Sequence, residues 1–104
     1  RWTIQAKEQQ AEKEQSDCEY TPDPNNEPEF DRFGVDYWAL NDVATGWFVR
    51  GEIFRKQGKC PEAREAYTVV IEEYACAYAC DSASCNSFWN VAGGAQDALS
   101  EQCP

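Results

Sequence analysis

The sequence predicts an all-α protein, and three observations carry this prediction. The stretch from Trp47 to Tyr74 has apolar residues at helical spacing on both sides of a short turn, and this spacing continues upstream to Asp36. The first sixteen residues consist mostly of strong helix formers. The segment from Phe88 to Glu101 carries a further apolar helical stripe. A chain of 104 residues forms one domain, in which we expect a helical arm (1–17), an acidic, proline-rich linker (18–35) and a helical body (36–104).

The stretch from Trp47 to Tyr74 predicts an antiparallel pair of helices. Gly58 is placed to end the first helix, because glycine adopts the left-handed conformation there without a Cβ clash. Pro61 is placed in the first turn of the second helix, where its missing N–H costs nothing. One face of each helix is apolar: Val43, Trp47, Gly51 and Phe54 in the first, and Ala63, Tyr67, Val70 or Ile71, and Tyr74 in the second.

The same stretch resembles a tetratricopeptide repeat in the order and spacing of its large and small residues. The residues that carry the resemblance are Trp47, Gly51, Phe54, Gly58, Ala63 and Tyr67. It departs from the family pattern at Arg50, Cys60, Val70 and Ala75. The resemblance implies a scaffold of stacked helix pairs that binds protein partners, and it implies no chemistry.

The N-terminal arm has an unusually thin apolar stripe. Trp2, Ile4, Ala6 and Ala11 are its apolar residues, and the first three alternate as in an extended strand, so the arm is expected to be a helix with an extended start as the alternative. Because most of the stability of a helix in a protein comes from burial of its apolar face, so small an apolar surface stabilises this helix little. The arm is therefore interpreted as a tail, a stalk or a segment that docks on another molecule, with Trp2 and Ile4 as anchors.

The linker contains three prolines, Pro22, Pro24 and Pro28, which are expected to exclude helix and favour extended chain. Oxygen-bearing side chains alternate along it, which is the pattern of a calcium loop. Pro28 stands where such a loop needs glycine, so a solvated acidic linker is expected and calcium the alternative. The candidate calcium ligands are Asp23, Asn25, Glu27, Glu29 and Asp31. Thr21, flanked by prolines, is a candidate O-glycan site.

The region from Asp36 to Gln57 is expected to be one long helix, with Asn41 as an N-cap if the helix is broken. Trp38 and Phe48 lie off its main apolar stripe. They are candidates for a contact surface, the alternative being that they pack against the N-terminal arm.

After Tyr74 the second helix is expected to continue to about Ala79, followed by a loop over residues 82–86 and a last helix from Phe88 to Glu101, capped by Ser84 or Ser87. Trp89 precedes Gly93 by four residues, as Trp47 precedes Gly51. The segment from Trp89 to Leu99 is therefore interpreted as a partial second repeat.

Six cysteines and no histidine in a small acidic chain predict a disulfide framework, and hence an extracellular, secreted protein with the periplasm as the alternative. We expect at least two intrachain bonds; the count leaves the pairing open. A zinc site built on Cys76, Cys80 and Cys85 is the alternative, although its spacings are unusual. The six residues are Cys18, Cys60, Cys76, Cys80, Cys85 and Cys103. The chain contains no methionine, which is expected of a mature form left after removal of a leader, with an artificially trimmed sequence as the alternative.

The composition disfavours several classes of function. A net charge of −10 disfavours nucleic acids and anionic membranes, and no apolar run is long enough to span a bilayer. Without histidine there is no Ser–His or Cys–His pair, and no cofactor motif occurs, so we expect no catalysis and no cofactor.

Two functions remain. A single helix pair leaves apolar faces that neighbouring repeats normally cover. The first expectation is therefore a secreted module that assembles with copies of itself, into an oligomer or filament, through its N-terminal arm. The alternative is an adaptor whose groove around Trp47, Phe48 and Tyr67 binds a peptide of a different protein.

Overall fold

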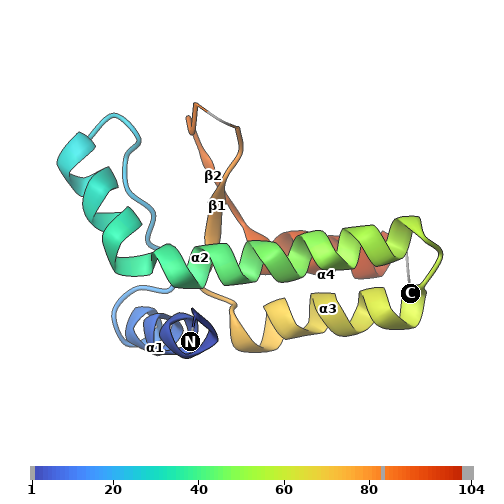
Figure 1. Cartoon of the computed structure of the whole chain (residues 1–104). Coiled ribbons are helices and arrows are strands. Elements are labelled where there is room, and N and C mark those ends of the chain that lie inside the picture. The colour runs from blue at the N-terminus through green and yellow to red at the C-terminus, as the bar shows by residue number, and fades with distance from the viewer. Residues whose placement is uncertain (1, 83, 102–104) are drawn as a thin grey trace.

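The computed structural model describes residues 2–82 and 84–101, and it confirms the all-α class. Within these residues, four helices and a small hairpin follow one another: α1 (Trp2–Gln15), α2 (Glu27–Lys56), α3 (Cys60–Glu73), β1 (Tyr78–Cys80), β2 (Phe88–Asn90) and α4 (Val91–Glu101). The long part of α2, α3 and α4 run side by side, α1 is seen end-on beneath α2, and the hairpin projects from the body (Figure 1).

The helix α2 starts within the segment expected to be an extended linker. Asn26 caps it by accepting a hydrogen bond from the Glu29 backbone N–H, and Pro28 occupies the first turn, where proline is tolerated. The prediction that the three prolines exclude helix up to residue 35 was therefore wrong. Only Pro22 and Pro24 precede the helix, in the segment that joins α1 to α2.

A kink divides α2 close to the expected helix start at Asp36. Tyr37 has non-helical backbone angles (φ −128°, ψ 17°), and the two parts of α2 point in different directions on either side of it (Figure 1). Asn41 lies inside the helix and is not an N-cap: its side chain instead accepts a hydrogen bond from the Tyr78 backbone N–H.

The predicted pairing of α2 with α3 is present, and it depends on a close approach at Gly51. A Cβ atom at Gly51 would lie 2.6 Å from the ring of Tyr67, which is fully buried. Ala63 is also fully buried, and Gly58 follows the C-cap of α2 with a φ of +76°. Trp47 and Phe54 are half-buried against the core.

The chain after α3 differs from its prediction. The helix stops at Glu73, short of Ala79, and β1 pairs with β2 in an antiparallel hairpin. The last helix begins at Val91, so Trp89 lies in a strand and is not part of a repeat helix. Asn90 caps α4 by accepting a hydrogen bond from the Gly93 N–H at 2.8 Å, the role expected of Ser84 or Ser87.

Two disulfides join described residues and confirm that the cysteines cross-link within the chain. Cys18 bonds Cys76 across 58 positions, and Cys80 bonds Cys85 across five. Cys60 is also disulfide-bonded, and Cys103 lies outside the described residues. The zinc alternative is excluded, because Cys76, Cys80 and Cys85 all take part in these bonds. A cross-link that closes a long loop stabilises the fold chiefly by restricting the unfolded chain.

The core is built mainly from small residues around two tyrosines. Its fully or almost fully buried members include Leu40 and Ala44 of α2, Tyr67 and Val70 of α3, and Tyr74. In the described part of the chain, no helix combines the length and apolar character that a membrane span requires.

The close approach at Gly51 generates the first prediction. Gly51→Leu should lower the free energy of unfolding by about 1–3 kcal/mol, because the new side chain would overlap the buried ring of Tyr67. Gly34→Leu is the matched control, since Gly34 also lies in α2 and a Cβ there meets nothing within 4 Å. Thermal and urea unfolding check both variants. An unchanged midpoint for Gly51→Leu would show that α2 and α3 do not cross at this residue.

Candidate interaction surface

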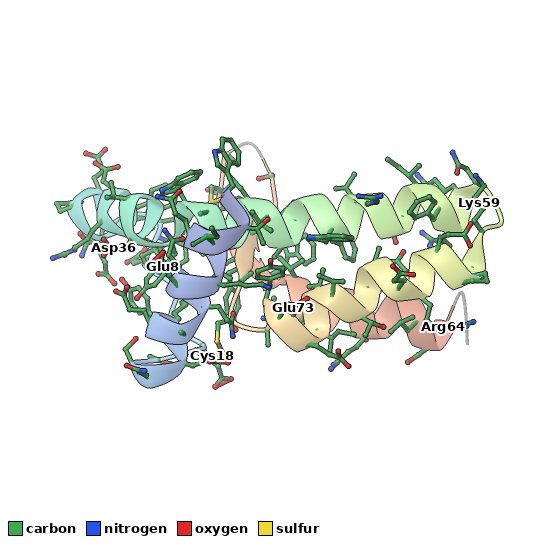
Figure 2. The ribbon with its side chains drawn as sticks, turned by 60° about the horizontal axis from the view of Figure 1, so that its bottom comes forward. Glu8, Cys18, Asp36, Lys59, Arg64 and Glu73 are labelled. Carbon is green, nitrogen blue, oxygen red and sulfur yellow. A yellow bond between two sulfur atoms is a disulfide. The ribbon has the colours of Figure 1, made fainter. Side chains whose placement is uncertain are left out.

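The arm α1 docks on its own chain through a stripe of mostly polar residues. Ala6, Gln9, Gln10 and Lys13 recur at helical spacing on the face that meets α2 and the turn after α3; Gln9 is half-buried and the other three are buried. α1 lies across α2, and Cys18 just beyond it anchors its end to Cys76 (Figure 2). The arm is therefore a packed part of the domain, and its start at Trp2 is helical, not extended.

Lys13 is the centre of this contact. It is fully buried, and its ammonium donates a hydrogen bond to the Cys76 carbonyl oxygen at 2.9 Å. The rings of Phe33, Tyr37 and Tyr78 surround the nitrogen, with ring centroids 4.8–5.4 Å away. Burial lowers the pKa of Lys13 to about 8, against a smaller opposing effect of the Asp17 carboxylate.

Gln10 and Gln9 complete the docking through hydrogen bonds to the backbone. The Gln10 side-chain oxygen accepts from the Cys76 N–H at 2.9 Å. The Gln9 side-chain oxygen accepts from the Leu40 N–H at 2.9 Å, directly after the kink at Tyr37. A break in a helix frees backbone N–H groups that need other partners. Gln9 therefore acts as a cap, supplied by another helix, for the second part of α2.

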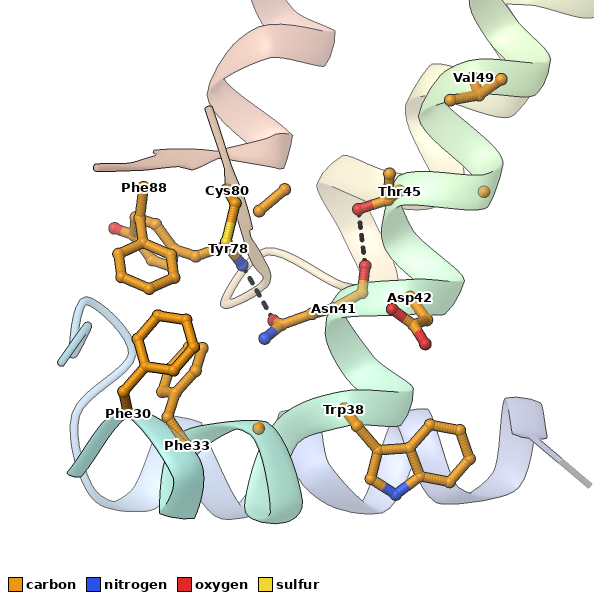
Figure 3. A pocket seen from close by; sticks show the side chains of 13 residues that line it. Phe30, Phe33, Trp38, Asn41, Asp42, Thr45, Val49, Tyr78, Cys80 and Phe88 are labelled. Atoms are coloured by element: carbon orange, nitrogen blue, oxygen red, sulfur yellow. Dashed lines mark hydrogen bonds between the residues drawn. The ribbon is translucent and has the colours of Figure 1, made fainter. Parts of the chain in front are cut away.

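An apolar groove of about 730 Å³ lies between the two parts of α2 and the β-hairpin. The side chains of Phe30 and Phe33 rise from the first part of α2 towards Phe88 on β2, and Trp38 and Val49 lie further along α2 (Figure 3). The ring centroids of Phe30 and Phe33 lie 6.0 and 5.5 Å from that of Phe88. We call this site the apolar groove. A cavity of this size and lining suits an apolar side chain or ligand.

Few polar groups line the apolar groove, and their hydrogen bonds are mostly structural. Asn41 accepts from the Tyr78 N–H at 3.0 Å, and Thr45 donates to the Asn41 carbonyl oxygen (Figure 3). Asp42 is exposed and is the one charged residue of the lining. The groove thus brings together no nucleophile, base and orienting group of the kind that catalysis requires.

The side of α2 that faces away from α3 forms one wall of the groove and continues past it to Ile53. We call it the outer face of α2; it consists of Trp38, Asp42, Gly46, Val49 and Ile53, spaced three or four residues apart. Val49 and Ile53 are 47% and 51% exposed, although aliphatic side chains of this kind are usually buried. Gly46 borders both the groove and a smaller hollow beside Arg50.

The four predicted contact residues do not form one surface. Trp2 packs edge-on against Trp38, with ring centroids 5.2 Å apart, as the packing alternative foresaw for Trp38. Ile4 is 65% exposed and lies two residues from Trp2, so it points to the opposite side of α1. Phe48 is half-buried between Tyr67 and Trp89. Because Tyr67 is fully buried, the predicted groove around Trp47, Phe48 and Tyr67 is filled by the protein itself.

The candidate calcium ligands are used by the local fold instead. Asp23 accepts a hydrogen bond from the Asn25 N–H, and Glu29 accepts from the Tyr20 hydroxyl at 2.7 Å and from the Asn26 amide. Burial and the Glu29 hydrogen bond raise the pKa of Tyr20 to about 12. Glu27, Glu29 and Asp31 lie in the first turns of α2, so they do not encircle a loop. Across residues 2–82 and 84–101, no three Asp, Glu or Cys side chains cluster as metal ligands.

Thr21 is half-buried next to the buried Pro22, and its glycosylation stays a prediction. Comparison with protein-family models, curated proteins and solved structures finds no match to this chain. The assignment of a function therefore depends on the surfaces described above.

The buried lysine generates the second prediction. Between about pH 8 and 10.5 the unfolded chain holds a proton on Lys13 that the folded protein has released, so the free energy of unfolding should rise with pH. The chain has no histidine, and burial raises the pKa of Tyr67, Tyr74 and Tyr78, so these tyrosines oppose the rise only near the upper end of the range, where they begin to ionise in the unfolded chain. The rise should be about 1–3 kcal/mol between pH 7.5 and 9.5.

Urea unfolding at several pH values measures this rise, and Lys13→Met is the control because methionine keeps the length of the side chain without the charge. The variant should lack this rise over the same range. Equal profiles for the two proteins would mean that Lys13 is solvated and that α1 is not docked as described.

Proposed function

We propose that the protein is a non-catalytic interaction module of an oxidising, extracellular compartment, and that it assembles with further copies of itself. The observation that carries the proposal is the uncovered outer face of α2, on which Val49 and Ile53 are about half exposed beside the apolar groove. Contiguous apolar surface of this kind on a small protein marks a contact site.

The tetratricopeptide-like pairing of α2 with α3 supports the same conclusion. In arrays of helix pairs, the outer side of each pair is covered by the next one. Here α3 and α4 cover one side of α2, and α1 covers only the region around the kink. A second molecule would cover the remaining side of α2, in the place that a further repeat of the same chain takes in such arrays.

The disulfides support the choice of compartment. Cys18–Cys76 and Cys80–Cys85 require an environment that keeps thiols oxidised, and extracellular and periplasmic spaces do so. The proposal differs from the sequence-based expectation in its contact surface. Because α1 is docked on its own chain by Gln10 and Lys13, the arm is not free to serve as the connector.

The apolar groove favours a second candidate function, the binding of an extended segment of a different protein. Three phenylalanines and Trp38 would receive its apolar side chains, and Asp42 would favour a basic residue in it. This candidate needs no second copy of the chain. It therefore gains support if the native protein is a monomer at every concentration.

The third prediction concerns the mass of the native protein in solution. Light scattering during size-exclusion chromatography should give a mass above that of one chain, rising with protein concentration. Val49→Asp should reduce it to the monomer mass, because a charge at this position would be buried in the contact.

Ile4→Asp is the matched control, an equally drastic change at an exposed aliphatic residue on the far side of α1. It should leave the mass unchanged. If Ile4→Asp abolishes assembly and Val49→Asp does not, the arm is the connector after all. A monomer at millimolar concentration would refute self-assembly.

A further inference from the structure

We infer that α2 pairs antiparallel with α2 of a second copy, through their outer faces, and that the two helices cross at Gly46. This inference rests on the proposed self-assembly and specifies its geometry. It starts from the one exposed glycine in the middle of the outer face: a Cβ there would meet nothing within 4 Å, so the backbone is open to a partner.

Helices approach most closely where a small residue stands at the crossing. Inside the chain, Gly51 receives the ring of Tyr67 in this way, and Gly94 on α4 is approached closely by the rings of Trp89 and Phe48. Gly46 has the same character without a neighbour, and hollows lie on both of its sides. Side chains of a crossing helix could enter these hollows.

Two charged residues that flank Gly46, Asp42 on the outer face and Arg50 beside it, select the second copy as the partner, and they select its direction. Asp42 and Arg50 each lie four residues from Gly46, about 6 Å along the helix axis in opposite directions. In an antiparallel pair with two-fold symmetry at Gly46, each Asp42 faces Arg50 of the other copy. A parallel pair would instead place like charges opposite each other, which is unfavourable.

Both charged groups are available for such a contact. Within the described part of the chain, neither Asp42 nor Arg50 forms an ion pair. The Arg50 guanidinium is held against the rings of Trp47 and Phe54, with centroids 5.2 and 5.8 Å away. The same symmetry places Val49 opposite Val43, which is partly buried against the core. A chain with a net charge of −10 repels its copies over most of its surface, and this face is self-complementary.

Charge exchange tests the pairing. Asp42→Lys alone and Arg50→Glu alone should each weaken self-association on the order of tenfold, because like charges would then meet twice in every pair. The double variant should restore the dissociation constant of the wild type. An equimolar mixture of the two single variants should form the mixed pair in preference to either homodimer. Sedimentation equilibrium gives the constants, and native mass spectrometry distinguishes the pairs by mass.

Two controls separate pairing from net charge. Asp97→Lys on α4 and Lys59→Glu before α3 change the charge by the same amounts away from the outer face, and both should leave association within about twofold of the wild type. Gly46→Leu should abolish association while the helical circular dichroism is retained.

The outcomes distinguish the antiparallel pairing of α2 from the proposed self-assembly on which it rests. If the wild type associates but the charge variants behave like their controls, or the mixture does not favour the mixed pair, the antiparallel pairing is wrong and self-assembly stands. If the wild type does not associate at all, the proposed self-assembly itself fails.

Discussion

The contact on which the rest of the structure depends is the docking of α1 on the turn after α3. Lys13 donates to the Cys76 carbonyl oxygen and Gln10 accepts from the Cys76 N–H, so two side chains satisfy both backbone polar groups of one buried residue. Gln9 does the same for the Leu40 N–H across the kink in α2. An unpaired backbone group in such a place would cost about 1–3 kcal/mol. Without α1, therefore, three buried or half-buried backbone groups would lose their partners. Removal of α1 would for this reason also destabilise the remaining part of the domain.

This contact also determines where apolar surface remains uncovered. The kink at Tyr37 turns the first part of α2, with Phe30 and Phe33, towards the β-hairpin, and the apolar groove lies between them. The Cys18–Cys76 bond holds the end of α1 next to the same turn. With α1 engaged at the kink and α3 on the inner side, the outer face of α2 is the side left for a partner. The interaction proposals thus follow from the packing inside the chain.

The sequence predicted the class of fold and the helix pair because their signals are local. Gly51, Gly58 and Ala63 play the roles their spacing indicated, since a close crossing and a left-handed C-cap each require a particular small residue. The start of α2 was missed because proline in a first turn resembles proline in an extended linker until the cap Asn26 is recognised. The strands were missed because three-residue strands have almost no periodicity to detect.

Neither the docking of α1 nor the apolar groove could be predicted, because the contacts that form them are not local in the sequence. A search for an apolar stripe treats Gln9, Gln10 and Lys13 as solvent-facing, although their spacing with Ala6 is that of a buried helix face. Their partners lie some thirty to sixty-six positions away, at Leu40 and Cys76, and no local pattern specifies them. The groove depends on the kink and on β2, and neither has a recognisable signature in the sequence.

Amide hydrogen exchange measured by mass spectrometry tests the central contact most directly, because it reports the opening of α1 separately from the opening of the body. If α1 is docked by its polar stripe, its amides should be protected to a degree comparable with those of α3. Exchange of residues 6–13 within seconds, as in an unstructured peptide, while α2 and α3 stay protected would contradict the account, since α1 would then be a tail and the surface left on α2 would be larger than described.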